Sequence, residues 1–385
     1  MANENLGNAK KAKNDEFYTQ YADIEKEMNA YLEFNPDVFR DATILLPCDD
    51  PEWSNFTKYF AQRFQDLGLK KLISTSYAPN SKPKDIPYQP TLFEIESPDF
   101  DEEKTYENGK IFTLTRDMTG DGAINVDDLE WSYLEGDGDF RSEEITALRD
   151  QADIIITNPP FSLFREFLTW LVEGGKPFSI LGNMNAITYK EVFPLIKENK
   201  IWLGATIHSG DREFEVPAAL QTTSPSLRLD EEGKKFIRVD GIRWFTDLEH
   251  GRRHQPLSLM TQEENLKFNK AVKDIGYQKY DNYDAIEVPR TDAIPSDYDG
   301  VMGVPISFLS KYNPDQFEIL GMCENEDLYE MKTKRFTSSE CKAAYLAKFG
   351  KTGTYDLNAS GVLNIGGQLE KVYQRILISH KKVAK

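Results

Sequence analysis

The sequence predicts an α/β fold, because short apolar runs alternate with amphipathic helical segments and are followed by acidic or proline-containing turns. The runs over 42–46, 71–75 and 153–157 have the length and composition of buried strands. Between the first two runs, one helical face carries the apolar side chains of Phe56, Tyr59, Phe60, Phe64 and Leu67 and ends at Gly68. This order is typical of a doubly wound sheet, in which ligands bind at the carboxyl ends of the strands.

Further segments continue the alternation. We expect helices over 24–32, 163–171 and 189–197, and strands over 178–182 and 201–204. Gly174 and Gly175 are suited to end the second of these helices. Residues 236–239 and 242–245 are expected to form a closing hairpin, because a two-residue Asp-Gly turn separates them.

Length and composition predict two domains. A chain of 385 residues is long enough for two buried cores, and its hydrophobic content of 39% is that of a globular protein. The alternation of strands and helices is lost near residue 251. We therefore predict a first domain over 1–250, with an acidic, loop-rich insert at about 80–150, and a smaller mixed α+β domain over 251–385.

The distribution of charge matters more than its total. A net charge of −18 argues against a nucleic-acid partner if it is spread evenly. However, 94–153 contains nineteen acidic and five basic side chains, whereas 331–385 contains eleven basic and three acidic ones. Screening limits electrostatic reach to about 10 Å at ordinary salt, so a basic C-terminal face could bind phosphates. Both runs could equally be solvated surfaces.

The sequence contains no apolar stretch of secretory or transmembrane length. Its three cysteines, Cys48, Cys323 and Cys341, have neither metal-ligand nor redox spacing, as expected in a reducing compartment. We therefore expect a cytoplasmic protein that does not associate with membranes.

The tetrapeptide Asn158-Pro159-Pro160-Phe161 follows the apolar run 153–157 and is a candidate catalytic site. An exocyclic amine on a base is a poor nucleophile, because its lone pair is delocalised into the ring. The Asn158 side-chain oxygen and the Pro159 carbonyl could accept its two hydrogens, and two prolines would keep these acceptors in place. Stacking of a base on Phe161 would contribute about 1–3 kcal/mol.

The alternative is a plain turn after a strand, since Asn and Pro both favour turns. The position of the tetrapeptide at the carboxyl end of a strand favours a binding site. Taken alone, the tetrapeptide indicates only that a planar amine is methylated.

The segment after the first strand, Cys48-Asp49-Asp50-Pro51, places carboxylates where a ribose or an amino group can be bound. The chain lacks a G-x-G-x-x-G turn here, which argues against a dinucleotide and against a phosphate cradle. The same carboxylates could instead cap the helix that follows.

A third motif lies in the acidic insert and resembles an EF-hand calcium loop. Oxygen-bearing side chains occupy the ligand positions, with Gly at the sixth position, and we predict a structural calcium site at Asp117, Thr119, Asp121, Asn125 and Asp128. The last ligand is Asp rather than the longer Glu, and no partner loop is evident. The alternative is an acidic loop that matches the pattern by chance.

Several segments together resemble the EcoRI-type adenine-specific DNA methyltransferase family over most of the chain. They are residues 14–19, 48–56, 138–142, 158–161, 297–305 and 316–321. The resemblance implies S-adenosylmethionine as cofactor. It also implies which residues line the cofactor's methionine end and ribose, namely Phe17, Tyr18, Thr19, Cys48, Asp49, Asp50, Pro51, Asn55 and Phe56. By the same resemblance, Asp139 and Phe140 would contact the adenine ring of the cofactor.

The family resemblance implies a Rossmann-like methyltransferase sheet, followed by a target-recognition region over 251–385. The implied activity is N6-methylation of a flipped adenine in a specific duplex site, either in restriction-modification or as an epigenetic mark. Candidate DNA contacts are Arg252, Arg253, Lys332, Lys334, Arg335 and Arg375. Double-stranded DNA is the expected partner, a cognate restriction endonuclease is a candidate partner, and the chain is expected to be a monomer or weak dimer.

Two alternative functions stay open at this point. The same tetrapeptide occurs in enzymes that methylate RNA or a glutamine amide in proteins. A catalytically silent DNA-binding protein could also retain the fold, although the intact Asn158 and Phe161 argue against it.

Overall fold

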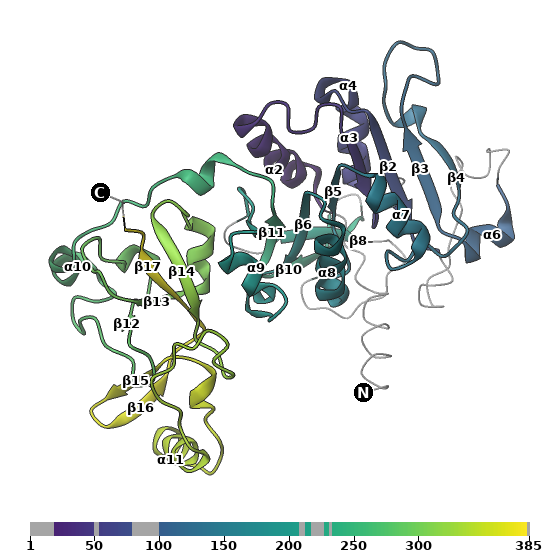
Figure 1. Cartoon of the computed structure of the whole chain (residues 1–385). Coiled ribbons are helices and arrows are strands. Elements are labelled where there is room, and N and C mark those ends of the chain that lie inside the picture. Colours follow the sequence, from purple (N-terminus) through teal and green to yellow (C-terminus); the bar gives the residue numbers. More distant parts are fainter. Residues whose placement is uncertain are drawn as a thin grey trace. The chain divides into compact units, whose positions relative to one another are not determined.

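The computed structural model describes residues 19–49, 54–78, 100–207, 212–216, 227–230 and 233–382. The chain divides into two compact units, Met1–Gly251 and Arg252–Lys385 (Figure 1). Within the described ranges, no helix is long and apolar enough to cross a membrane.

The first unit is built on one large mixed sheet of eight strands. Its centre consists of four adjacent parallel strands, in the order β2 (Lys71–Ser76), β1 (Thr43–Leu46), β5 (Ile154–Thr157) and β6 (Phe178–Asn183). Beyond β6, the sheet continues with β11 (Ile242–Thr246), which is antiparallel to β6, and then with β7 (Trp202–Leu203), which is antiparallel to β11. Beyond β2, it continues with β3 (Lys110–Leu114), which is antiparallel to β2, and then with β4 (Glu130–Tyr133), which is antiparallel to β3. The mixed α/β architecture predicted from the sequence is therefore present.

Both faces of this sheet are covered, which explains why β1 and β5 are apolar at almost every position. Ile44 and Leu46 of β1 pack in the same cluster as the helices α2 (Tyr21–Phe34) and α3 (Asn55–Gln62). On the opposite face, Phe164 of α8 (Phe164–Gly174) lies 5.0 Å from Phe245 of β11, measured between ring centroids. The helix α7 (Glu143–Gln151) precedes β5 in the chain.

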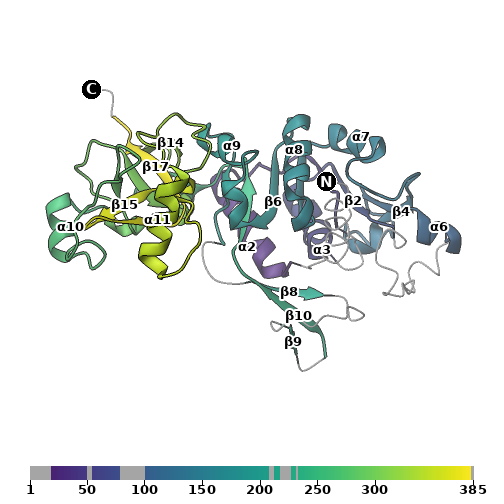
Figure 2. The same cartoon turned by 90° about the horizontal axis from the view of Figure 1, so that it is seen from below.

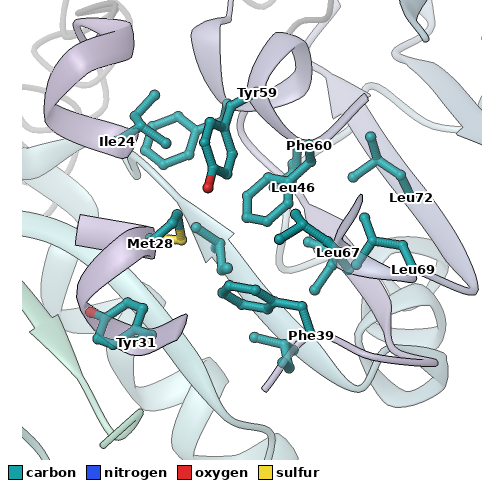
Figure 3. Packing of buried hydrophobic residues seen from close by; sticks show 14 of the residues in the cluster. Ile24, Met28, Tyr31, Phe39, Leu46, Tyr59, Phe60, Leu67, Leu69 and Leu72 are labelled. Atoms are coloured by element: carbon teal, nitrogen blue, oxygen red, sulfur yellow. The ribbon is translucent and has the colours of Figure 1, made fainter. Parts of the chain in front are cut away.

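Figure 3 shows how α2 and α3 pack in one core: Ile24 of α2 lies beside Tyr59 of α3, whereas Tyr31 lies farther along α2 and points away from Tyr59. The sequence predicted one continuous helix ending at Gly68. This prediction was wrong in one respect, because the helix is interrupted at a single arginine, which separates α3 from α4 (Phe64–Leu67). The interruption allows the apolar side chains at both ends of the four-residue helix to reach the core.

A buried carboxylate fastens α2 to the sheet. Glu27 accepts hydrogen bonds from the backbone N–H groups of Ala205 (2.7 Å) and Thr206 (2.9 Å), directly after β7. It also accepts one from the Tyr31 hydroxyl (2.8 Å), which lies 2.9 Å from the Ser179 hydroxyl of β6. Burial raises the pKa of Glu27. The first helix is thereby tied to β6 and to the turn after β7, through bonds that span 148 and 178 residues of the chain.

The predicted closing hairpin was also wrong. The strand β10 (Lys235–Val239) pairs with β8 (Arg212–Val216) and β9 (Leu227–Leu229) in a separate three-stranded sheet, whereas β11 belongs to the large one. Figure 2 shows the small sheet extending away from the large sheet. The physical reason is burial. All five residues of β11 are buried, which suits a place inside the large sheet, whereas β10 exposes Arg238 and suits the small outer sheet.

The predicted helix over 189–197 is shorter than expected. A 3-10 segment, Met184–Thr188, precedes it, and the α-helix itself is α9 (Phe193–Lys197). Pro194 lies in the first turn of α9, where the missing N–H of proline does no harm, but it could not lie in the interior of a longer helix. The acidic insert contributes α6 (Glu102–Glu107) and the edge hairpin of β3 and β4.

The second unit combines a four-stranded sheet, a two-stranded hairpin and two helices. The sheet has the order β12 (Ile286–Glu287), β13 (Met302–Pro305), β17 (Arg375–His380) and β14 (Phe317–Met322). The hairpin consists of β15 (Val362–Ile365) and β16 (Gln368–Lys371), and the helices are α10 (Gln262–Phe268) and α11 (Ser338–Phe349). Cys341 and Ala344 of α11 pack with Leu357 and Val362 in a small core of their own.

Candidate functional site

The carboxyl ends of β1 and β5 bring two predicted site segments together. The Asp49 carboxylate is buried and accepts hydrogen bonds from the hydroxyls of Ser54 (2.7 Å) and Thr157 (2.5 Å). Thr157 is the last residue of β5 and directly precedes Asn158. Because β1 and β5 are parallel neighbours, segments 108 residues apart in the chain meet at one edge of the sheet.

Further hydroxyls from β2 hold the segment after β1. The Ser74 hydroxyl donates to the Asp49 carbonyl and lies 2.9 Å from the Thr57 hydroxyl of α3. The Thr75 hydroxyl donates to the Pro47 carbonyl (3.0 Å). Sequence reasoning missed these residues, although polar side chains in an otherwise buried strand were a usable signal.

The loop that carries Asp139 reaches the same edge of the sheet through Gly138. This glycine has a φ of +86°, and a Cβ atom there would lie 2.3 Å from the Ser76 carbonyl oxygen of β2. Only glycine therefore fits this close approach. The next residue, Asp139, forms an ion pair with Arg141 (2.6 Å). Burial acts to raise the pKa of Asp139, but hydrogen bonds from Arg141 and its charge lower that pKa overall.

Cys48 lies within electrostatic reach of both predicted carboxylates. Burial raises the pKa of its thiol, and the negative charges of Asp49 and Asp139 raise it further. A thiol in such surroundings stays protonated at neutral pH and is a poor nucleophile. The structure thus brings Cys48, Asp49 and Asp139 close together.

Other predicted cofactor residues lie around this centre. The Asn55 side chain donates to the Thr19 carbonyl (2.8 Å), and the buried Thr19 hydroxyl has no hydrogen-bond partner among the described residues. The rings of Phe56 and Phe140 are both buried; the former lies edge-on to Trp244 (5.9 Å) and the latter packs on α8. Phe17, Tyr18, Asp50 and Pro51 lie outside the described residues.

The tetrapeptide leaves β5 and enters a 3-10 turn, Phe161–Leu163. The Pro160 carbonyl accepts from the Leu163 N–H (2.9 Å), whereas no described residue donates a hydrogen bond to the Pro159 carbonyl. The half-buried ring of Phe161 lies edge-on to the ring of Phe214 in β8, 6.4 Å away. The three-stranded sheet therefore reaches the tetrapeptide, a contact that the sequence did not predict.

The predicted calcium loop is not supported. Its carboxylates already accept hydrogen bonds from backbone N–H groups: Asp117 from Gly122 (2.8 Å), and Asp128 from Met118 (2.8 Å) and Thr119 (2.9 Å). Over the residues that the structure describes, no group of three or more His, Cys, Asp or Glu side chains could hold a metal ion. Asp121 and Asn125 bind backbone N–H groups in the same way, so the loop closes on itself.

The predicted DNA contacts fall into two groups. Arg375 is buried, and its guanidinium lies 2.6 Å from the buried Glu287 carboxylate. Arg253 is also buried. Lys332 is partly buried, which lowers the pKa of its ammonium, and this ammonium donates to the Asn325 carbonyl (3.0 Å). Arg253 and Arg375 do not suit contact with phosphates, because both side chains are buried. A count of positive charges in the sequence does not show which of them lie on the surface.

Lys334 and Arg335 are exposed and Arg252 is partly exposed. Lys334 pairs with Asp281 (2.8 Å), and the Arg335 guanidinium donates to the carbonyls of Asn325 (3.3 Å) and Glu326 (2.9 Å). These positions are compatible with the predicted DNA contacts.

The family model and the known proteins that this chain resembles are all named as methyltransferases. The family model described as "Adenine-specific methyltransferase EcoRI" matches residues 5–381. The chain is 45% identical to the Type II methyltransferase M.EcoRI of Escherichia coli, over 83% of this chain and 89% of that protein. It is 34% identical to the Type II methyltransferase M.MpnI of Mycoplasma pneumoniae, over 86% and 90% of the two chains.

A third relative, the Type II methyltransferase M.MgeORF184P of Mycoplasma genitalium, is 33% identical over 97% of this chain and 98% of its own length. The comparison with solved structures gave no match. The match of the family model to nearly the whole chain, together with these relatives, shows that the chain belongs to the EcoRI family of adenine-specific methyltransferases.

Proposed function

We propose that this chain transfers a methyl group from S-adenosylmethionine to N6 of an adenine in a specific duplex DNA site. The observation that carries the proposal is the hydrogen bond between Thr157 and Asp49, which joins the predicted cofactor segment to the predicted catalytic tetrapeptide. The large sheet would then be a Rossmann-like methyltransferase sheet, and residues 251–385 would be the target-recognition region.

The residues at the ends of β1 and β5 fit S-adenosylmethionine. This cofactor supplies an electrophilic methyl group on a positively charged sulfur. The buried Asp49 carboxylate, which accepts from hydroxyl groups, creates a negative potential that suits its cationic groups. The buried Thr19 hydroxyl, without a partner among the described residues, supplies a further polar group.

The tetrapeptide supplies the groups that would act on the adenine. The Asn158 side chain and the Pro159 carbonyl would accept the two N6 hydrogens, and Phe161 would stack on the flipped base. The Pro160 carbonyl is already used within the 3-10 turn, which favours Pro159 as the backbone acceptor. Catalysis would then rest mainly on positioning and on preorganised acceptors.

The substrate is proposed from the family. A family model that spans 5–381, and relatives named as Type II methyltransferases, support DNA rather than RNA or a protein glutamine. A cognate restriction endonuclease, a cytoplasmic location and a monomeric or weakly dimeric state complete the proposal. Structural calcium is not part of it.

The decisive test is methyl transfer from labelled S-adenosylmethionine to unmethylated plasmid DNA, followed by sequencing for N6-methyladenine. The wild-type chain should modify one sequence context. Asn158→Ala should reduce transfer by roughly 100-fold or more, as loss of a preorganised polar group does elsewhere, while the Kd for S-adenosylmethionine stays nearly unchanged. The control is Asn35→Ala, an exposed asparagine of the same unit. Full activity of Asn158→Ala would contradict the proposal.

A further inference from the structure

The helix α11 has one buried and one exposed face. Cys341 and Ala344 are buried in the small core with β15 and the segment before it. The exposed stripe, named here the outer face of α11, consists of Ser339, Lys342, Ala343 and Leu346. Their spacing of i, i+3, i+4 and i+7 places these four side chains on the same side of the helix. Leu346 is 52% exposed.

This helix is well defined at both ends. Thr337 and Glu340 form a reciprocal capping box at its start, and Gly350, with a φ of +66°, ends it. Twelve residues give a length of about 18 Å. An α-helix with its side chains is about 10–12 Å wide, which matches the B-DNA major groove of about 12 Å. Serine and alanine on the outer face would permit a close approach to base edges.

Positive charges without a carboxylate partner lie along this helix. Lys342, on the outer face, and Lys351, directly after the helix, are exposed and form no ion pair with any described residue. Arg335, just before the helix, donates to backbone carbonyls, which do not cancel its charge. By contrast, Lys348 on the flank lies 3.8 Å from Glu370. The three uncompensated charges thus extend from one end of α11 to the other.

We propose that the outer face of α11 enters the major groove of duplex DNA, with Arg335 and Lys351 contacting backbone phosphates at its two ends. Lys342 could bind guanine O6 and N7, Leu346 could contact a thymine methyl group, and Ser339 could bond to a base of either kind. The charge complementarity with phosphates favours DNA over a protein partner. This inference rests on the proposed function, and it names the element that reads the sequence.

The test compares charge reversals at two helices of the full-length chain. Lys342→Glu alters the outer face of α11, and Lys267→Glu makes the same change on the exposed surface of α10. Figure 1 shows the two helices apart from each other within the second unit. The probe is a duplex that carries the context methylated by the wild-type chain, or unmethylated plasmid DNA if no context emerges. We expect Lys342→Glu to raise the Kd for DNA at least tenfold and Lys267→Glu to change it less than twofold.

Two further variants separate reading of bases from phosphate contact. The double variant Arg335→Ala/Lys351→Ala should lower the salt dependence of log Kd by about two, roughly one for each phosphate contact. Leu346→Ala should relax the methylated context at one position without this change in salt dependence. The inference would be overturned if all the α11 variants and Lys267→Glu had the same DNA affinity and the same methylated context. It would also be overturned if the α11 variants lost binding only to a protein partner and not to DNA.

Thermal unfolding and the Kd for S-adenosylmethionine should be unchanged in every variant, because all the altered side chains are exposed and lie in the second unit. These two measurements exclude misfolding as the cause of weaker DNA binding. A wild-type chain that binds DNA without methylating it would contradict the proposed function but would leave the α11 comparison readable.

Discussion

Two buried carboxylates, one in each unit, are held in different ways. Glu287 in the second unit accepts from the Arg375 guanidinium at 2.6 Å and from the Tyr280 hydroxyl. Asp49 in the first unit accepts from the hydroxyls of Ser54 and Thr157. A guanidinium neutralises the charge that it binds, whereas hydroxyl donors orient a carboxylate and leave its charge in place. The first arrangement suits a structural role and the second suits a site for a cationic ligand.

The largest effect is expected from Arg375→Met, which would leave Glu287 buried without its charged partner. Such a change destabilises a protein by about 3–5 kcal/mol. Urea unfolding should show this loss in the second unit, while the Kd for S-adenosylmethionine stays the same. The control Arg290→Met breaks an exposed ion pair with Asp292 and should cost less than about 1 kcal/mol. Equal stability of the two variants would show that the Glu287 pair is not structural.

A further carboxyl of the first unit, the half-buried Asp247, sharpens the comparison because a backbone N–H holds it. It accepts from the Phe178 N–H (2.7 Å), and burial raises its pKa to about 6. The folded state therefore binds more protons than the unfolded state between about pH 4 and 6. Stability should fall as pH rises through this window, by on the order of 2 kcal/mol, and should level off above it. Asp247→Asn should abolish this component; an unchanged stability profile would contradict the raised pKa.

Asp49→Asn tests the other side of the comparison. The amide preserves the shape of the side chain and can still accept from Ser54, so we expect stability to change by less than about 1 kcal/mol. Loss of the negative charge should weaken S-adenosylmethionine binding by roughly tenfold or more, measured by calorimetry. Asp37→Asn, at an exposed carboxyl of the same unit, is the matched control. If the Kd is unchanged and stability falls, Asp49 has the structural role of Glu287.

The smallest effect is expected at Thr157, a positioning residue. Thr157→Val removes its hydroxyl donor to Asp49 and should lower kcat by about tenfold, while KM for S-adenosylmethionine changes less, because the tetrapeptide directly follows this residue. Thr157→Ser should restore most of the rate. Thr169→Val, on the exposed side of α8, removes a hydroxyl that bonds only within its own helix. A similar loss in both variants would indicate a general effect of the hydroxyl on stability.

The sequence predicted the parallel centre of the large sheet because β1 and β5 are buried on both faces and so contain continuous apolar runs. It also placed Asn158 at the end of its strand. It could not predict the partners of β11, because an Asp-Gly turn favours a hairpin locally while burial of all five residues is a tertiary effect. Nor could it show that Arg375 is internal, because pairing with Glu287 joins residues 88 positions apart.

The same limit applies to the site. The motifs predicted Asp49 and Asn158 as site residues. The hydroxyls that hold Asp49 come from Ser54, Ser74 and Thr157 in three separate segments and follow no local pattern. The calcium prediction failed for a related reason. Carboxylates at ligand spacing also suit the backbone N–H groups of their own loop, and sequence alone does not distinguish these two uses.

The position of β11 in the large sheet has a consequence for synthesis of the chain. Within the described residues, β7 pairs with the sheet through β11, although β11 is made about forty residues later. The turn after β7 donates hydrogen bonds to the buried Glu27 carboxylate. This turn can be held in place only once β11 has paired with β7, which requires that residue 246 has left the ribosome. On a translating ribosome, the first unit would mature in a single late step, so that a nascent chain ending before β11 is expected to be a substrate for chaperones.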